Sequence, residues 1–197
     1  MIEKVFLDLS KDVSECTQCE LHKERKNAVF GIGNPYAEIM IIGKGPGHDD
    51  DLQGIPFVGK SGQLLDKILS ACGFTREEHV YIANIVKCRL PDNRNPLPDE
   101  RDACLPWLFK QISSIRPQII ILLGATAVKG LIDPDAKITE LRGKWMEWEG
   151  FQVMPTFHPS ALLKNPALKK DSWEDFKMVV HKYRELVDPD HHTPTEI

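Results

Sequence analysis

Four short apolar runs along the chain predict β-strands. They lie at residues 39–43, 80–86, 118–124 and 151–157 and are rich in Ile, Val and aromatic side chains. The first run closes on Gly43. Uniformly apolar runs of this length are typical of parallel strands that are covered on both faces.

Helical periodicity occupies the segments between and after these runs. Helices are predicted at residues 61–73, 96–115, 125–132 and 171–187. The first ends on Gly73, a common helix terminator, and the second begins at Pro98 with an acidic first turn. The last is amphipathic and begins at Asp171 or Ser172, which can cap it.

The alternation of strands and helices predicts an α/β fold. We expect a three-layer α/β/α sandwich around a short, mainly parallel central sheet of about four strands. Residues 1–190 form a single domain in this interpretation, and residues 191–197 form a frayed, polar tail. Ligands of such folds bind beyond the carboxyl ends of the strands, here in the loops 44–60, 87–95 and 156–165.

Composition agrees with one globular domain. The chain has 197 residues, 42% of them hydrophobic and 27% charged, and no apolar run is long enough to span a bilayer. We expect no secretory signal and a cytoplasmic protein. The net charge of −4 gives no overall attraction to nucleic acid, so any such binding needs a local basic surface.

Residues 54–61, "GIPFVGKS", match the Walker A pattern of phosphate-binding loops. A phosphate-binding loop follows directly on a strand and directs backbone N–H groups at the phosphates. This segment lies well beyond the predicted strand end at Gly43, and Pro56 has no N–H to donate. The aspartates at positions 49–51 also repel a triphosphate. We therefore expect the protein not to bind a nucleotide triphosphate. Nucleotide binding that Lys60→Ala abolishes would instead support a Walker A loop.

The same region fits a different binding loop. Gly43, Gly45 and Gly47 follow the first predicted strand and allow a ligand to approach the backbone closely. Phe57 either offers a flat apolar face to that ligand or packs in the core, and the sequence context leaves both roles open.

Five cysteines suggest a metal centre. Cys16 and Cys19 form a CxxC pair, and fifteen residues separate Cys88 from Cys104. Disulfides are rare in the cytosol, and four thiolates suit either a [4Fe–4S] cluster or zinc. Zinc usually takes two short pairs, from which the second pair departs. Cys72 is predicted to be a buried apolar residue.

Three separated segments resemble the family 4 uracil-DNA glycosylases, the iron–sulfur branch of the uracil-DNA glycosylase superfamily. The segments are "GKGPGHDDDLQGIPFVGKSGQLL", "VYIANIVKCRLPDNRNPLPDE" and "TFHPSALL", together with the four cysteines in their order. The resemblance extends from about Cys16 to the closing helix, and the joint order and spacing make it specific. It implies the uracil-DNA glycosylase fold and a structural [4Fe–4S] cluster on Cys16, Cys19, Cys88 and Cys104.

The resemblance also implies a site for an extruded uracil. Gly43, Lys44 and Gly45 would contact the base through their backbone, and Phe57 would stack on it. Asn84 would read the uracil edge, accepting from N3–H and donating to O4, which cytosine cannot match. His158 would donate to O2, where negative charge grows as the glycosidic bond breaks. Asn84, His158 and the residue at position 44 are the implied catalytic set.

A second implied function is DNA binding around an extruded nucleotide. Either Leu162 or Leu163 would fill the vacated stack, with Lys164, Lys169 and Lys170 near phosphates. Lys87, Arg89 and Arg94 would make a second backbone contact. The residues assigned to DNA binding are Leu162, Leu163, Lys164, Arg89 and Arg94.

The chain departs from the family pattern at Lys44, where the family usually has a glutamate that positions the attacking water. A lysine reverses the charge beside a developing sugar cation. Three alternatives follow: a carboxylate or base among residues 48–51 replaces it, activity is reduced, or the Lys44 amine attacks C1′ itself.

The leading hypothesis is a DNA repair glycosylase that hydrolyses uracil from DNA and leaves an abasic site. The alternative is a catalytically attenuated iron–sulfur protein that recognises uracil in DNA, because of Lys44. The expected partner is uracil-containing DNA, single- or double-stranded. We expect a monomer that binds no membrane.

Overall fold

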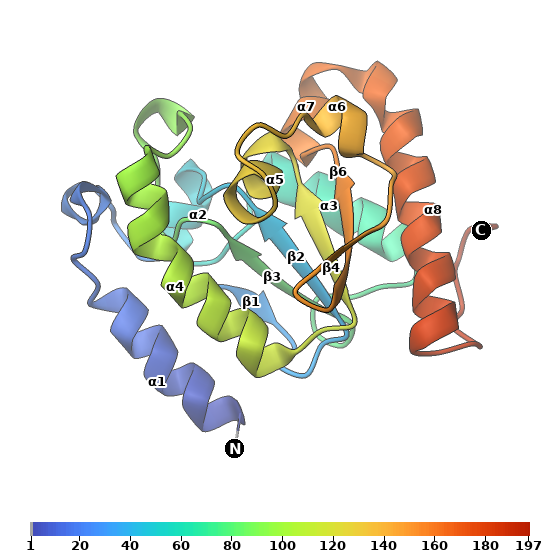
Figure 1. The fold of residues 1–197 in the computed structure, drawn as a ribbon, viewed down its shortest axis with the longest axis horizontal. Helices are drawn as coiled ribbons and strands as arrows, with labels where there is room; N and C mark the ends of the chain where they lie inside the picture. Colours follow the sequence, from blue (N-terminus) through green and yellow to red (C-terminus); the bar gives the residue numbers. More distant parts are fainter. Residues whose placement is uncertain (1) are drawn as a thin grey trace.

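Six strands form one sheet in the computed structural model of the protein, which describes residues 2–197 (Figure 1). The order across the sheet is β1-β3-β2-β4-β6-β5. Its four central strands run parallel to one another: β2 (Ile39–Gly43), β3 (Val80–Asn84), β4 (Ile119–Leu123) and β6 (Phe151–Thr156). The edge strands β1 (Ile32–Gly33) and β5 (Met146–Trp148) are antiparallel to their neighbours.

The helices connect these strands and close the chain. They are α1 (Ile2–Ser14), α2 (His48–Gln53), α3 (Lys60–Ala71), α4 (Pro98–Ile115), α5 (Ala125–Leu131), α6 (Ile138–Leu141), α7 (Pro159–Lys164) and α8 (Lys169–Leu186). Three 3₁₀ turns are η1 (Glu20–Lys23), η2 (Pro91–Asn93) and η3 (Pro166–Leu168). No helix within residues 2–197 combines the length and the apolar character that crossing a membrane requires.

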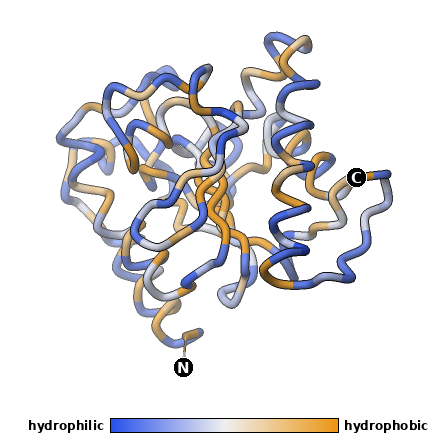
Figure 2. Tube along the Cα trace, turned by 45° about the vertical axis from the view of Figure 1, so that its right-hand side comes forward, coloured by the Kyte–Doolittle hydropathy of each residue, from blue (hydrophilic) through white to orange (hydrophobic). Residues whose placement is uncertain are grey.

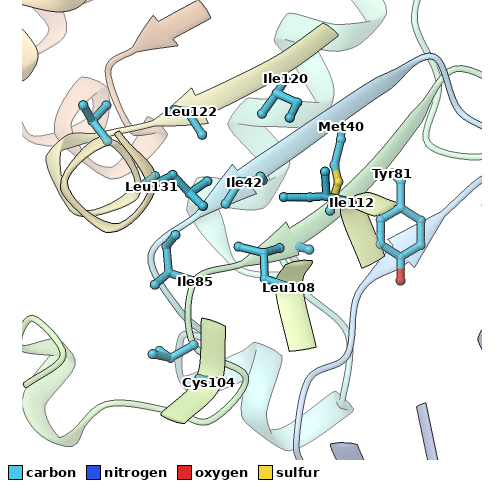
Figure 3. Close-up of a cluster of buried hydrophobic side chains, with 14 of the residues drawn as sticks. Met40, Ile42, Tyr81, Ile85, Cys104, Leu108, Ile112, Ile120, Leu122 and Leu131 are labelled. Carbon is cyan, nitrogen blue, oxygen red and sulfur yellow. The ribbon is translucent and has the colours of Figure 1, made fainter. Parts of the chain in front are cut away.

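Two apolar layers hold the helices to the sheet. On one face, alternate strand residues pack against α4 and α5; Figure 3 shows Met40, Ile42, Ile120 and Leu122 with Leu108, Ile112 and Leu131. On the other face, the intervening strand residues pack against α3 and α8. The tube in Figure 2 is accordingly most hydrophobic along the central strands. Burial of each such side chain contributes roughly 1.5–3 kcal/mol.

The predicted α/β class is confirmed, and the predicted number of strands is corrected. The four predicted strands are the four parallel ones, and each predicted helix is present with its ends shifted by a few residues. The edge strands β1 and β5 are two and three residues long. Runs this short carry no periodicity, so only their pairing with a neighbouring strand identifies them.

The first helix was not predicted. Phe6, Leu9 and Val13 of α1 are buried at helical spacing, and α1 lies beside α4 (Figure 1). Phe6 meets Tyr81 edge to face, with 5.3 Å between ring centroids. The amphipathic pattern of residues 2–14 is the signal that would have found this helix.

The predicted polar tail is less frayed than expected. Residues 191–197 form no helix or strand, but His191 is buried and stacks on Phe74 with 4.6 Å between ring centroids. Its Nε2 lies 2.9 Å from the Cys72 carbonyl oxygen. Arg184 donates to the carbonyl oxygens of His191 and Ile197. The tail is therefore fastened to α8 and to the end of α3.

Candidate active site

The carboxyl ends of the parallel strands place the predicted site residues at one edge of the sheet. In the register between β2 and β3, Gly43 pairs with Asn84. In the register between β4 and β6, Leu123 pairs with Thr156, and His158 follows two residues later. Residues far apart in the sequence therefore converge on one rim.

Gly43 lies at the centre of this rim. A Cβ atom added to it would lie 2.6 Å from Oδ1 of Asn84 and 2.8 Å from Cζ of Phe57. The rings of Phe57 and His158 have centroids 5.5 Å apart and planes tilted by 32°. Asn84 and Phe57 thus lie against the backbone of Gly43, where only glycine fits, and His158 lies beside the Phe57 ring.

The Asn84 side chain is buried and has no hydrogen-bond partner. It is 1% exposed, and neither Oδ1 nor Nδ2 has a donor or acceptor among residues 2–197. An unpaired buried polar group costs on the order of 1–3 kcal/mol. An amide held at this cost at the end of a buried strand has one acceptor and two donor hydrogens available to a ligand.

The Phe57 ring is held from its backbone. Phe57 has a positive φ of 56°, which is unusual for a side chain of this size. Arg76 donates through Nη2 to the Phe57 carbonyl oxygen at 2.6 Å and through Nη1 to that of Pro56 at 2.9 Å. A Cβ on Gly62 would lie 1.7 Å from the Phe57 carbonyl oxygen. The loop "GIPFVGKSG" therefore positions an aromatic ring.

The Walker A match at residues 54–61 falls on the loop that holds the Phe57 ring. The loop follows the C-cap of α2 at Gly54, and Gly59 is the N-cap of α3. It does not follow a strand, which agrees with the interpretation of the sequence.

His158 is the N-cap of α7, and its ring orientation is fixed by the next turn. Nδ1 accepts the Ser160 backbone N–H at 3.1 Å, and Oγ of Ser160 lies 2.8 Å from the same nitrogen. Because Nδ1 acts as an acceptor, the proton of the neutral imidazole resides on Nε2. Burial, with a smaller contribution from the charge of Lys44, lowers the pKa of His158 to about 4. The ring is therefore a neutral donor at neutral pH.

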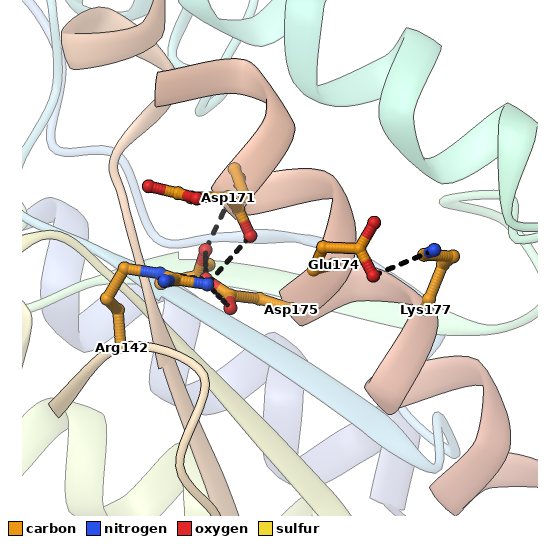
Figure 4. A network of polar contacts seen from close by, with 7 residues as sticks. Arg142, Asp171, Glu174, Asp175 and Lys177 are labelled. Atoms are coloured by element: carbon orange, nitrogen blue, oxygen red, sulfur yellow. Dashed lines mark hydrogen bonds and ion pairs between the residues drawn. The ribbon is translucent and has the colours of Figure 1, made fainter. Parts of the chain in front are cut away.

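A buried ion pair supports the strand that leads to His158. Arg142, which follows α6, pairs with Asp175 of α8, and Figure 4 shows this pair with Asp171. Oγ1 of Thr156, the last residue of β6, donates to Asp175 at 2.7 Å. Asp175 is 1% exposed, and burial raises its pKa despite the opposing effect of Arg142. The network ties the end of β6 to α8.

Lys44 directly follows β2 at the carboxyl edge of the sheet. Its Nζ donates to the Asn93 carbonyl oxygen at 2.5 Å. Burial and, second, the charge of Lys164 lower the pKa of Lys44. Lys44 also lines the same cavity as Phe57 and His158.

That cavity has a volume of about 380 Å³, within the range of small-molecule sites. Lys44 to Asp50 form one wall, the residues around Phe57 form another, and His158, Ser160 and Lys164 form a third. A hollow of about 660 Å³ between α8 and residues 193–197 is larger. The smaller cavity is the candidate site, because Lys44, Phe57 and His158 line it. Asn84 is not among the lining residues and lies beside Gly43, the residue before Lys44.

Two of the three aspartates in this wall have structural roles. Asp50 accepts the backbone N–H groups of Gly47 at 3.1 Å and Val58 at 2.9 Å. Asp51 accepts those of Lys26 and Asn27. Asp49 is exposed and lines the cavity. It is the aspartate whose carboxylate faces solvent there.

The leucines predicted to contact DNA differ in exposure. Leu162 is buried at 1% exposure and packs inward from α7, so it does not offer an apolar wedge. Leu163 is 44% exposed, and Lys164 beside it is also exposed. The choice between the two leucines therefore falls on Leu163.

The predicted basic contacts near Cys88 are partly corrected. Arg94 makes a bidentate pair with the buried carboxylate of Glu100, at 2.8 and 2.7 Å, because that carboxylate requires a partner. Lys87 is 2% exposed and donates to the Asn84 carbonyl oxygen and to Oε1 of Gln111. Arg89 is half-buried, and its Nη1 lies 3.1 Å from Nδ1 of His48. Of the three, only Lys87 is buried; Arg89 and Arg94 are both partly exposed.

The four predicted cluster ligands line one pocket. Cys16 and Cys19 come from the segment after α1, Cys88 from the loop after β3, and Cys104 from α4. Nη1 of Arg25 lies 3.1 Å from Sγ of Cys88, and the Lys87 backbone N–H lies 3.2 Å from Sγ of Cys104. Cys72 is buried on the opposite face of the sheet, as predicted.

The pocket holds thiol donors that suit either a [4Fe–4S] cluster or zinc. The side chains of residues 2–197 include no group of three or more His, Cys, Asp or Glu already gathered closely enough to hold a metal ion. Trp107 lines the same pocket, and its buried Nε1–H has no acceptor in the described part of the chain. The sulfur atoms of a cluster accept such donors.

Several site residues were not predicted from the sequence. Ser160 orients His158, Arg76 holds the Phe57 loop, and Asn93 accepts from Lys44. Gly124 has a φ of 85°, and a Cβ on it would lie 2.9 Å from Cβ of His158. Ser160 follows His158 by two residues, as helix caps require, so only this residue had a local signal.

Comparisons with known proteins identify the family to which the chain belongs. The sequence model described as "Uracil DNA glycosylase superfamily" matches residues 30–177. A type-4 uracil-DNA glycosylase of Thermotoga maritima is 46% identical over 165 residues, which cover 83% of this chain and 85% of that protein. One from Saccharolobus solfataricus is 46% identical over 88% of this chain and 84% of its own length. One from Archaeoglobus fulgidus is 40% identical, over 87% and 90%.

Proposed function

The chain belongs to the uracil DNA glycosylase superfamily, and from this membership we propose that it is a DNA repair enzyme that hydrolyses uracil from DNA. Uracil extruded from DNA enters the cavity of about 380 Å³ at the carboxyl edge of the sheet. The N-glycosidic bond is hydrolysed there, and an abasic site remains. The observation that carries this proposal is the unpaired, buried amide of Asn84 beside Phe57 and Gly43.

The pairing capacity of Asn84 matches the edge of uracil. Oδ1 accepts from N3–H, and Nδ2 donates to O4. Cytosine has an acceptor at N3 and a donor at N4, so both amide atoms of Asn84 would remain unpaired against it. Sites that leave buried polar groups unpaired reject the wrong ligand by large factors. The ring of Phe57 stacks on the base in this proposal and holds it against Asn84.

His158 stabilises the leaving group. Its Nε2–H donates to O2, where negative charge develops as the bond to C1′ breaks. A neutral imidazole suits this role, because uracil leaves as an anion and needs a hydrogen bond more than a full proton transfer. Ser160 fixes the tautomer, and the pKa of about 4 keeps the ring neutral.

A water molecule attacks C1′ of the cationic sugar. We assign its orientation to Asp49, because backbone N–H groups occupy the carboxylates of Asp50 and Asp51. Leu163 fills the gap that the extruded nucleotide leaves, and Lys164 and Arg89 contact phosphates. The site is complete within one chain, so we expect the protein to act as a monomer.

Cys16, Cys19, Cys88 and Cys104 hold a [4Fe–4S] cluster in this proposal, supported by their common pocket. When bound, the cluster acts as a structural cross-link between the segment after α1, the loop after β3, and α4. The loop after β3 also carries Lys87, which donates to the Asn84 carbonyl oxygen. The cross-link therefore stabilises the position of Asn84 through this chain's own residues.

The test is release of free uracil from a uracil-containing oligonucleotide. We expect turnover by the wild type, and a fall in kcat/KM of about 100-fold or more for Asn84→Ala, because the transition state loses its hydrogen bonds. Gln63→Ala on the exposed side of α3 is the control and should match the wild type. Binding of uracil-containing DNA without release by the wild type would indicate an attenuated recognition protein. Equal release by Asn84→Ala would contradict the proposed role of Asn84.

A further inference from the structure

Lys44 has the environment of a reactive amine. It begins the loop after β2, lines the cavity with His158 and Lys164, and is half-buried. Lysine becomes an amine nucleophile when it is desolvated or lies beside another cation. Both conditions lower the pKa of Lys44, desolvation first and the charge of Lys164 second.

The position of the amine is suited to the sugar. Asn84 and Phe57, which hold the base in the proposed function, lie beside Gly43, the residue before Lys44. Lys44 itself lines both this cavity and the adjoining hollow of about 160 Å³ that His158 and Ser160 also line. One hydrogen bond to the Asn93 carbonyl oxygen retains its Nζ on the rim. The amine can exchange this exposed bond for a ligand without unpairing a buried group.

We propose that Lys44 gives the protein a second activity, the reversible capture of the abasic-site aldehyde as an imine. This inference rests on the proposed function, whose product carries that aldehyde in the ring-opened form of the sugar. The Nζ lone pair attacks C1′, and the carbonyl electrons move to oxygen, which takes up a proton. Nitrogen then loses a proton, water leaves, and a C1′=N double bond remains.

Reductive trapping tests the proposal. An oligonucleotide with a preformed abasic aldehyde, generated beforehand by an unrelated glycosylase, is incubated with the holoprotein and sodium borohydride. Borohydride delivers hydride to the imine carbon and leaves a stable secondary amine. We expect a covalent protein–DNA adduct with wild type and at least a roughly tenfold lower yield with Lys44→Arg, since a guanidinium does not form the imine at neutral pH. Lys67→Arg is the matched control, because Lys67 is exposed on α3 outside the cavity, and it should retain the adduct.

Peptide mapping of the wild-type adduct gives a result that does not depend on a variant's folding. The reduced sugar should be found on Lys44. No adduct with wild type, or an adduct mapped to another lysine, would overturn the proposal. Because the substrate is already abasic, this outcome is independent of uracil release, which tests the proposed function separately.

Discussion

At the scale of single residues, the site depends on the hydrogen bonds that the Asn84 amide lacks and on the one that the His158 ring accepts. Neither amide atom of Asn84 has a partner within residues 2–197, whereas one ring nitrogen of His158 accepts a hydrogen bond from Ser160. The first arrangement leaves a recognition edge open, and the second determines which ring nitrogen carries the proton. Lys44 donates a hydrogen bond to the Asn93 carbonyl oxygen at the edge of the cavity.

The lowered pKa of His158 predicts a dependence of stability on pH. The unfolded chain binds a proton near pH 6.5, whereas burial, with Lys44, holds the folded-state pKa at about 4 against the opposing charge of Asp50. Stability therefore falls as the pH drops from about 6.5 towards 4. Between pH 7 and 4.5, the wild type should lose about 2 kcal/mol more unfolding free energy than His158→Gln, which does not titrate.

Urea denaturation of both proteins at the two pH values measures this difference. The remaining titratable groups are the same in both proteins, so their contribution to the difference in unfolding free energy cancels. Equal losses in wild type and His158→Gln would show that the folded imidazole protonates at its ordinary pKa.

At the scale of elements, the carboxyl end of β6 is tied to α8 by the Arg142–Asp175 pair and Thr156. Gly143 fits beside it, since a Cβ at this position would collide with Asp175. Burial raises the pKa of Asp175 even with Arg142 present, so the attraction only partly offsets desolvation. The pair therefore holds the strand end in place more than it adds net stability.

Removing one partner of this pair should cost more than removing both. We expect Arg142→Met to lower the free energy of unfolding by about 3 kcal/mol, because it leaves a buried carboxylate without a counter-ion. The double variant Arg142→Met/Asp175→Asn should be more stable than Arg142→Met alone. Urea denaturation of the single variants and the double variant measures the coupling. Additive effects would contradict it.

At the scale of the whole molecule, the cysteine pocket connects segments that lie far apart in the sequence. Residues 15–25 have one short 3₁₀ turn, η1, as their regular structure and line the cysteine pocket together with residues of α4 and of the loop after β3. A covalent centre on four cysteines would fix this segment to α4 and to that loop.

Loss of one ligand should release this segment. We expect wild type to contain four iron and four sulfide per chain and to absorb visible light as iron–sulfur proteins do. Cys88→Ser should lose iron and become sensitive to limited proteolysis within residues 15–25. Cys72→Ser, on the opposite face of the sheet, is the control and should keep both iron and resistance. A colourless wild-type protein with stoichiometric zinc would contradict the cluster.

The central strands could be predicted from the sequence. The apolar runs at 39–43 and 119–123 are buried along their whole length, and such runs have a local signature. The edge strands β1 and β5 have none. Leu162 and Leu163 are adjacent and chemically identical, so only packing determines that Leu163 is the exposed one.

The sequence by itself determined the α/β class, the three loops that hold the site, the cysteine set and the resemblance to uracil-DNA glycosylases, because these depend on local periodicity and on residue types at fixed spacing. Only the tertiary structure decided the contacts across the chain. Phe57 and Asn84 meet at Gly43. Arg94 and Lys87 bind buried partners, and Lys44 donates to the Asn93 carbonyl oxygen. Burial and hydrogen-bond partners are properties of a folded neighbourhood, which residues distant in the sequence create together.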